Sequence, residues 1–196
     1  MKTILRRGLL ALAIMALTFP ADAGPFEDGL AAAKRSDYAT ALLLWRPLAE
    51  QGNATAQYNL GLMSENGRGM PKESVNAVKW YRMAAEQGHA NAQNNLGFMY
   101  ANGQGVPQDY GEAMKWYRRA ADQRLAGAQY NLGLMQAYGE GVPHDTVSAH
   151  MWFNLAAAHG HENGQAIRGM VEELMSPDQI ADAQRMAREW MAKHQR

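Results

Sequence analysis

The octapeptide Ala-Thr-Ala-Gln-Tyr-Asn-Leu-Gly at residues 54–61 recurs as Ala-Asn-Ala-Gln-Asn-Asn-Leu-Gly at 90–97 and as Ala-Gly-Ala-Gln-Tyr-Asn-Leu-Gly at 126–133. Successive copies therefore begin 36 residues apart, at positions 54, 90 and 126. Three other features keep the same step: Trp80, Trp116 and Trp152, the Gly-x-Gly tripeptides beginning at 67, 103 and 139, and Pro71, Pro107 and Pro143. A fixed period of this length indicates a repeat architecture, in which each unit packs on its neighbours.

Each unit predicts two helices. In the first full unit, Gly67 can adopt the left-handed backbone that ends a helix, and Pro71 prevents that helix from resuming. The second helix has one apolar stripe at helical spacing, made of Ala77, Trp80, Tyr81, Ala84 and Ala85. The tryptophan and methionine series of the three units have helical spacing too, so we expect them in the core rather than in a ligand site.

A glycine lies inside the first helix of each unit, at Gly61, Gly97 and Gly133. Glycine costs about 1 kcal/mol relative to alanine in a helix interior, so a compensating contact is expected. We expect the glycine to let the first helix approach the Ala-Ala pair of the second, with the tryptophan filling the remaining space.

These motifs, together with Trp-Tyr-x-x-Ala-Ala at residues 80–85, resemble those of Sel1-like repeats, which are relatives of tetratricopeptide repeats. The resemblance implies an all-α fold, a right-handed α–α solenoid of helix pairs. Full repeats are expected at 54–89, 90–125 and 126–161, after a shortened first unit at 26–53. Residues 162–196 are expected to cap the solenoid, with a final helix that starts at the capping-box sequence Ser176-Pro177-Asp178-Gln179.

Composition limits the classes of function. Lys plus Arg and Asp plus Glu are both 19 in 196 residues, so no basic field is available for nucleic acid, and we expect no nucleic-acid partner. Cysteine is absent, which excludes disulfides, thiolate metal sites and a cysteine nucleophile.

The first 23 residues predict a secretory signal peptide. Lys2, Arg6 and Arg7 precede an apolar run over residues 8–19, and Ala21-Asp22-Ala23 offers small residues to a signal peptidase. The run is too short to span a bilayer core of about 30 Å as a helix. We therefore expect a periplasmic or secreted protein with no stable membrane span after cleavage; an uncleaved anchor is the alternative.

A search for catalytic and ligand motifs finds none that predicts an enzyme, a metal site or a cofactor. The sequence has no Gly-x-Ser-x-Gly, no His-Glu-x-x-His and no serine followed by lysine three residues later. The Gly-x-Gly turns lack the lysine and hydroxyl of a phosphate loop. His159, His161 and Glu162 could ligate a metal, but their place at a turn between repeats favours a solvated turn.

The remaining candidate is the inner face of the solenoid, which tetratricopeptide-like proteins use to bind peptides or helices. We expect the first helices to line it, and the partner-binding candidates are Thr55, Tyr58, Asn59, Leu62, Asn94, Asn95, Phe98, Tyr130, Asn131 and Leu134. Asn59, Asn95 and Asn131 form a series of amides that can donate to and accept from a peptide backbone. Bonding between neighbouring repeats is the alternative role for these asparagines. The face has no lysine or arginine at these positions, which argues against a clamp for a terminal carboxylate.

These features together favour an exported scaffold or adaptor that holds a protein or peptide partner on its inner face and has no catalytic activity. The alternative is a cell-envelope enzyme accessory or weak hydrolase acting on cell-wall peptide or glycan.

The signal peptide gives the first prediction. We expect the exported protein to begin at Gly24, because the small residues Ala21 and Ala23 fit a peptidase after the apolar run. Intact-mass measurement of the protein recovered from the periplasm or medium checks this. A mass that retains residues 1–23 would contradict cleavage.

Overall fold

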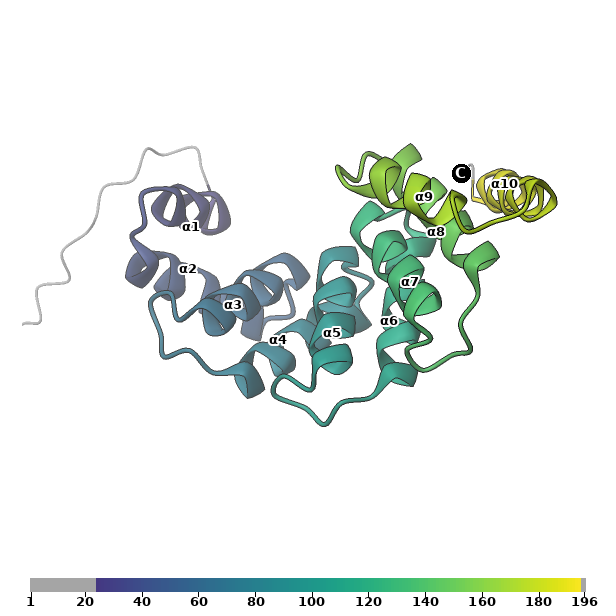
Figure 1. Cartoon of the computed structure of the whole chain (residues 1–196). Helices are drawn as coiled ribbons and strands as arrows, with labels where there is room; N and C mark the ends of the chain where they lie inside the picture. Colours follow the sequence, from purple (N-terminus) through teal and green to yellow (C-terminus); the bar gives the residue numbers. More distant parts are fainter. Residues whose placement is uncertain (1–23, 195–196) are drawn as a thin grey trace, which may run out of the picture.

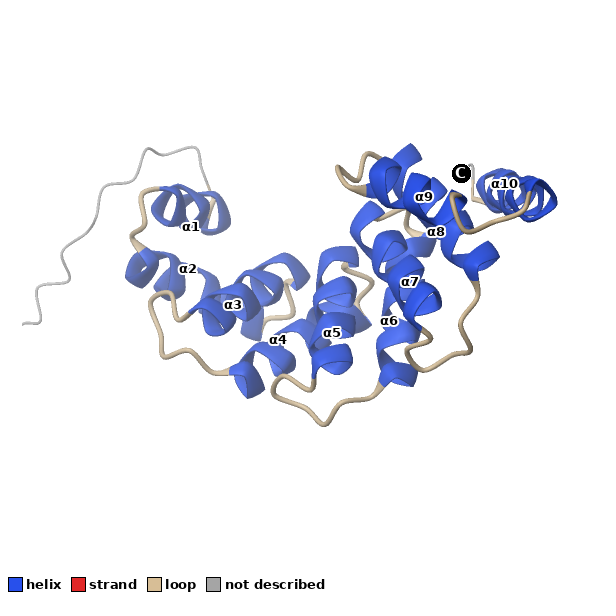
Figure 2. Cartoon of the chain, in the orientation of Figure 1, coloured by secondary structure: helices blue, strands red, loops and turns tan. Residues whose placement is uncertain are grey.

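The computed structural model describes residues 24–194, and the regular structure of this range is entirely helical (Figure 2). Its helices are α1 (Pro25–Lys34), α2 (Tyr38–Glu50), α3 (Ala54–Asn66), α4 (Ser74–Glu86), α5 (Ala90–Asn102), α6 (Tyr110–Asp122), α7 (Ala126–Tyr138), α8 (Thr146–Ala158), α9 (Gly164–Glu172) and α10 (Pro177–Lys193). The expected all-α solenoid of helix pairs is confirmed. The predicted signal peptide lies outside the described residues.

The helix pairs follow one another along an arch (Figure 1). Each odd-numbered helix from α1 to α7 packs on the helix that follows it, and α2, α4 and α6 also pack on the first helix of the next unit. Both α9 and α10 pack on α8 and close the C-terminal end. Between residues 24 and 194, no helix is both long enough and apolar enough to cross a membrane.

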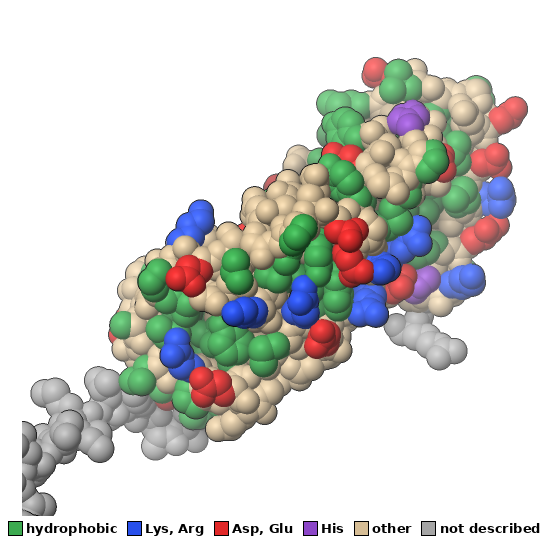
Figure 3. Space-filling view, turned by 90° about the horizontal axis from the view of Figure 1, so that it is seen from below, with side chains coloured by type: hydrophobic (Ala, Val, Ile, Leu, Met, Phe, Trp, Pro, Cys, Tyr) green, Lys and Arg blue, Asp and Glu red, His purple; other side chains and the backbone are tan. Residues whose placement is uncertain are grey.

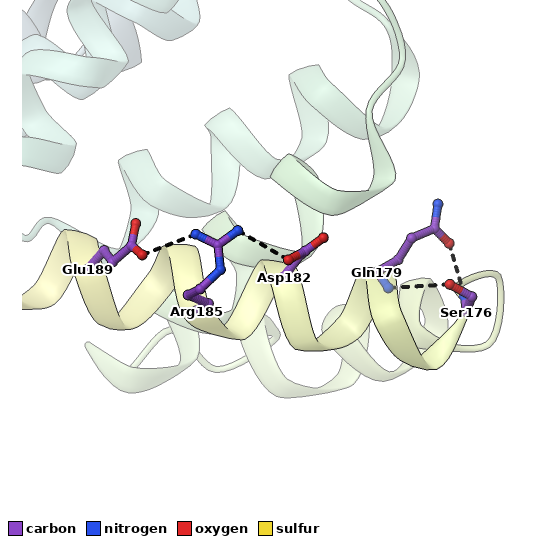
Figure 4. Close-up of polar contacts among 5 residues, drawn as sticks. All are labelled: Ser176, Gln179, Asp182, Arg185 and Glu189. Carbon is purple, nitrogen blue, oxygen red and sulfur yellow. Dashed lines mark hydrogen bonds and ion pairs between the residues drawn. The ribbon is translucent and has the colours of Figure 1, made fainter.

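The helix ends form as the sequence predicts. Gly67, Gly103 and Gly139 cap α3, α5 and α7 with φ of 68°, 64° and 71°, which is the left-handed region that favours glycine. The capping box of α10 is also present: the side chains of Ser176 and Gln179 each accept a hydrogen bond from the other residue's backbone N–H (Figure 4).

The expectation for the helix-interior glycines was wrong about their contact. The face of each glycine lies against the aromatic ring that follows the tryptophan position, not against the Ala-Ala pair. A Cβ at Gly61 would lie 2.5 Å from the Tyr81 ring, and one at Gly97 would lie 2.8 Å from the Tyr117 ring. The buried ring therefore occupies the space that a methyl group would need.

The tryptophans pack elsewhere than in the space beside the helix-interior glycines, where we expected them. Trp116 is buried and packs with the hydrophobic cluster that α4 and α5 form, so it extends from its own unit to the preceding one. Trp80 is only half-buried and packs on the cluster formed by α1, α2 and α3. Met63, Met99 and Met135 are buried, as predicted.

Most of the core lies between repeats. Three clusters each combine the second helix of one unit with the first helix of the next, at α2–α3, α4–α5 and α6–α7. Isolated units would expose these surfaces, because neighbouring units bury them.

Three buried glutamines stand at these same interfaces, and we call Gln57, Gln93 and Gln129 the glutamine column. Their side chains are 1%, 4% and 0% exposed. The side-chain NH₂ groups donate to carbonyl oxygens near the end of the preceding unit's second helix: Gln57 to Ala49 at 2.9 Å, Gln93 to Ala85 at 3.0 Å and Gln129 to Ala121 at 3.3 Å. Each member of the column therefore ties its own repeat to the one before it.

The side-chain oxygens of the column are also satisfied. Gln57 accepts from Gln87, and Gln93 accepts from Gln123, both at 2.7 Å, from the residues that cap α4 and α6. A buried amide with all its groups paired adds specificity, whereas an unpaired one would cost about 1–3 kcal/mol.

At the third member, His159 replaces the capping glutamine. Its Nδ1 lies 2.8 Å from the side-chain oxygen of Gln129, and its Nε2 accepts from Arg124 Nε at 3.1 Å. These partners fit the neutral imidazole with its proton on Nδ1. Burial, and then the nearby Arg124 guanidinium, lower the pKa of His159 from its ordinary value of 6.5.

The histidine predicts a pH dependence of stability. Because its pKa is lower in the folded protein, the unfolded chain binds the proton more tightly, and stability is lost as the pH falls below about 6.5. Burial lowers the pKa of His89 as well, with the same sign.

We expect His159→Gln, which places there the residue used at positions 87 and 123, to show a smaller fall in Tm between about pH 7.5 and pH 5.5 than the wild type. Thermal unfolding monitored by circular dichroism checks this. Identical falls in Tm would show that His159 is not held neutral.

Candidate functional site

The first helices α3, α5 and α7 carry partly exposed side chains on equivalent sides, and we call the surface that these side chains form the inner face. It is hollowed by three clefts, of about 160, 240 and 180 Å³, that follow the chain from the α1–α3 region to the α7–α9 region. Six of the ten candidates line or border these clefts or are exposed: Thr55, Asn59, Leu62, Phe98, Asn131 and Leu134.

Tyr58 and Tyr130 are held by histidines of the inter-repeat turns. Tyr58 stacks on His89 with ring centroids 4.6 Å apart, and Tyr130 stacks on His161 at 4.1 Å. Burial, and then the Glu65 carboxylate, raise the pKa of Tyr58. The stacking holds both tyrosine rings in place on the inner face.

The histidines of the turn that could have ligated a metal ion have other partners in the structure. His161 packs on Tyr130 while His159 faces Gln129 and Arg124. Within residues 24–194, no three His, Asp or Glu side chains are grouped closely enough to hold a metal ion.

The predicted asparagines form hydrogen bonds within the protein or are buried without a partner. Asn131 donates through Nδ2 to Asn94 of the preceding repeat at 3.1 Å, and Asn94 donates to Asn95 at 3.4 Å. This chain of amides joins α7 to α5, which is the bonding between repeats considered as the alternative. In the described part of the chain, the Asn59 Nδ2 is buried without a hydrogen-bond partner.

The middle cleft brings together three predicted residues, Phe98, Asn131 and Leu134. Phe98 is 42% exposed, which is unusual for so large an apolar side chain. The polar residues of this cleft were not predicted from the sequence: they are Asn102, Gln108, Tyr110 and Glu140. Gln108 donates to the Ala101 carbonyl at 2.8 Å and to the Tyr110 hydroxyl at 3.1 Å.

Glu140 lines the middle cleft together with Tyr117. Burial, and then the Glu140 charge, raise the pKa of Tyr117. The equivalent position of the first full unit is Arg68, which lines the N-terminal cleft with Asn59 and Leu62. Its guanidinium lies over the Tyr38 ring, 5.4 Å from the centroid. From the sequence, both positions were predicted only to be the central residue of a Gly-x-Gly turn.

The C-terminal end of the inner face is apolar. Tyr138 is 71% exposed, Met170 62% and Leu174 78%, and all three line the cleft between α7 and α9. None of the three was predicted, because residues 162–175 keep only part of the repeat pattern and Tyr138 is the last residue of α7, next to the turn. Exposed apolar side chains gathered in a concave surface indicate an interaction site.

Charged side chains of both signs are spread over the surface. Figure 3, which views the molecule from below the orientation of Figure 1, shows Lys, Arg, Asp and Glu interspersed with apolar side chains. The second helices carry exposed charges such as Lys79 and Lys115, and we call their exposed side the outer face. Mixed charges of this kind create no single-sign field.

Comparison with known families matches the Sel1 repeat over residues 24–53, 54–89, 90–125 and 126–161. The chain belongs to the Sel1 repeat family. Sel1 repeat proteins generally mediate protein–protein interaction, and the family consists mostly of non-enzymatic scaffolds. Comparison with proteins of curated function finds no match.

Solved structures of other Sel1 repeat proteins are similar. The crystal structure of a Sel1 repeat protein from Oxalobacter formigenes is 35% identical, with a TM-score of 0.69 over 74% of this chain and 60% of that one. A protective antigen present in uropathogenic Escherichia coli strains, with an SLR fold, is 36% identical, with a TM-score of 0.74 over 79% of this chain and 33% of that one. The chain therefore spans less than two thirds of either protein.

Proposed function

We propose that this Sel1 repeat protein is an exported scaffold that holds a segment of a protein partner along its inner face, in the periplasm or outside the cell. The observation that carries the proposal is the exposed aromatic ring of Phe98 at the middle cleft, between half-buried Leu62 and Leu134 of the neighbouring repeats. Aromatic anchors near the centre of an interface contribute most of its binding energy.

The repeat geometry supports a long, shallow contact. Equivalent residues one repeat apart have the same orientation, so one partner segment can meet similar side chains in succession. The stacked Tyr58 and Tyr130 rings are already ordered, which lowers the entropy that binding would otherwise cost.

The test compares two variants with matched exposure on opposite faces. Phe98 is 42% exposed on the inner face, and Met83 is 41% exposed on the second helix α4. We expect Phe98→Ser to reduce capture of the partner from envelope extract by roughly ten-fold or more, since losing a central aromatic anchor costs about 2 kcal/mol. Met83→Ser should retain capture, and both variants should keep their helical content.

Quantitative mass spectrometry of the proteins retained by immobilised mature protein measures the effect. If Met83→Ser loses the retained proteins and Phe98→Ser keeps them, the partner binds the outer face and the proposal is wrong.

A further inference from the structure

The Gly-x-Gly turns change charge along the inner face. Arg68, Gln104 and Glu140 occupy the same position in three successive turns, so this one site is positive, neutral and negative in turn. Arg68 lines the N-terminal cleft and Glu140 lines the middle cleft. Two repeats therefore separate a cation from an anion along one rim of the inner face. We call the series of three clefts along this face the groove.

Neither charge is neutralised within residues 24–194, where the ion pairs involve other residues. Arg68 is exposed, and its contact with the Tyr38 ring leaves its N–H groups free to donate. Glu140 is half-buried and lines the middle cleft together with Tyr117.

Some other charged side chains are already engaged within the protein. Glu172 at the end of α9 lies 2.7 Å from His150 and 3.3 Å from Arg168. Glu65 is a negative charge in the N-terminal part, but its carboxylate accepts a hydrogen bond from the buried Tyr81 hydroxyl at 2.5 Å.

Between the two charges, the floor of the groove is apolar or uncharged. Phe98 and Leu134 line the middle cleft, and Leu62 lines the N-terminal one. A bound segment would meet a cation, an uncharged stretch and an anion in that order.

We propose that the groove binds, in one orientation only, an extended partner segment with an acidic side chain at one end, a basic side chain at the other and apolar residues between. The acidic end lies at Arg68 and the basic end at Glu140. This inference rests on the proposed function and names the chemistry of the partner. Complementary charge fixes register and excludes wrong partners more than it adds affinity.

The spacing of the two ends follows from the repeat. Packed helices lie about 8–10 Å apart, so two repeats separate the charges by roughly 20 Å. An extended chain covers this distance with about six residues at about 3.3 Å each.

The experiment uses three synthetic peptides that share one apolar centre of this length. The first has one acidic and one basic end, the second has two acidic ends and the third has two basic ends. Fluorescence anisotropy with the mature protein measures their Kd. The wild type should prefer the first peptide by about two- to five-fold over the others, and the preference should shrink at about 0.5 M salt.

Charge reversal then exchanges the preference. Arg68→Glu makes both ends of the groove negative and should favour the peptide with two basic ends, whereas Glu140→Arg should favour the one with two acidic ends. Lys79→Glu, the same reversal on the outer helix α4, should leave the order of affinities unchanged.

Equal binding of the three peptides, no binding of any, or preferences that ignore both reversals would overturn this inference. A dimer of the wild-type protein that Phe98→Ser dissociates would overturn it too, because a second copy would then fill the groove. None of these results decides the proposed function itself. The comparison of Phe98→Ser with Met83→Ser tests that function separately, because neither substitution changes Arg68 or Glu140.

Discussion

The glutamine column is the interaction on which the solenoid depends. A side-chain amide that is shielded from solvent needs hydrogen-bond partners for both its NH₂ group and its oxygen. Gln93 donates to the Ala85 carbonyl and accepts from the Gln123 side chain, so its partners come from two neighbouring helix pairs. A shift of one repeat against the next would break the bond to Ala85 and leave buried polar groups unpaired. Apolar contacts tolerate such a shift far better, so the column fixes the register that the apolar core stabilises.

That register determines what the inner face can do. The column joins consecutive repeats at one end of the helices, and at the other end Gly69 of the first full unit approaches the Tyr38 backbone so closely that a Cβ would lie 2.7 Å from its carbonyl oxygen. With both ends fixed, Arg68 and Glu140 stand two repeats apart on the same rim, and Phe98 faces the groove between them. The charge order is therefore a property of the stack and not of any single repeat.

Much of this fold could be predicted from the sequence, because periodic glycines, prolines and apolar stripes specify where helices begin, end and bury a face. The contact of Gly61 could not, since several side chains of α4 could fill the space and only packing selects Tyr81. Gln57 belongs to the motif, but its partner at Ala49 is a backbone carbonyl, which has no sequence signal. At the site, helical spacing predicted Phe98 and Leu134, whereas Gln108 and Glu140 reach the cleft through loops whose path the pattern does not encode.

Urea unfolding of Gln93→Leu tests the role of the column most directly, since leucine keeps most of the volume and removes the amide. The account predicts a loss of about 1–3 kcal/mol in the free energy of unfolding and a transition that broadens or splits as the two halves uncouple. The control is Gln108→Leu, whose exposed amide bonds only within its own repeat and which should change stability by less than about 0.5 kcal/mol. A Gln93→Leu protein with wild-type stability and one sharp transition would contradict the account.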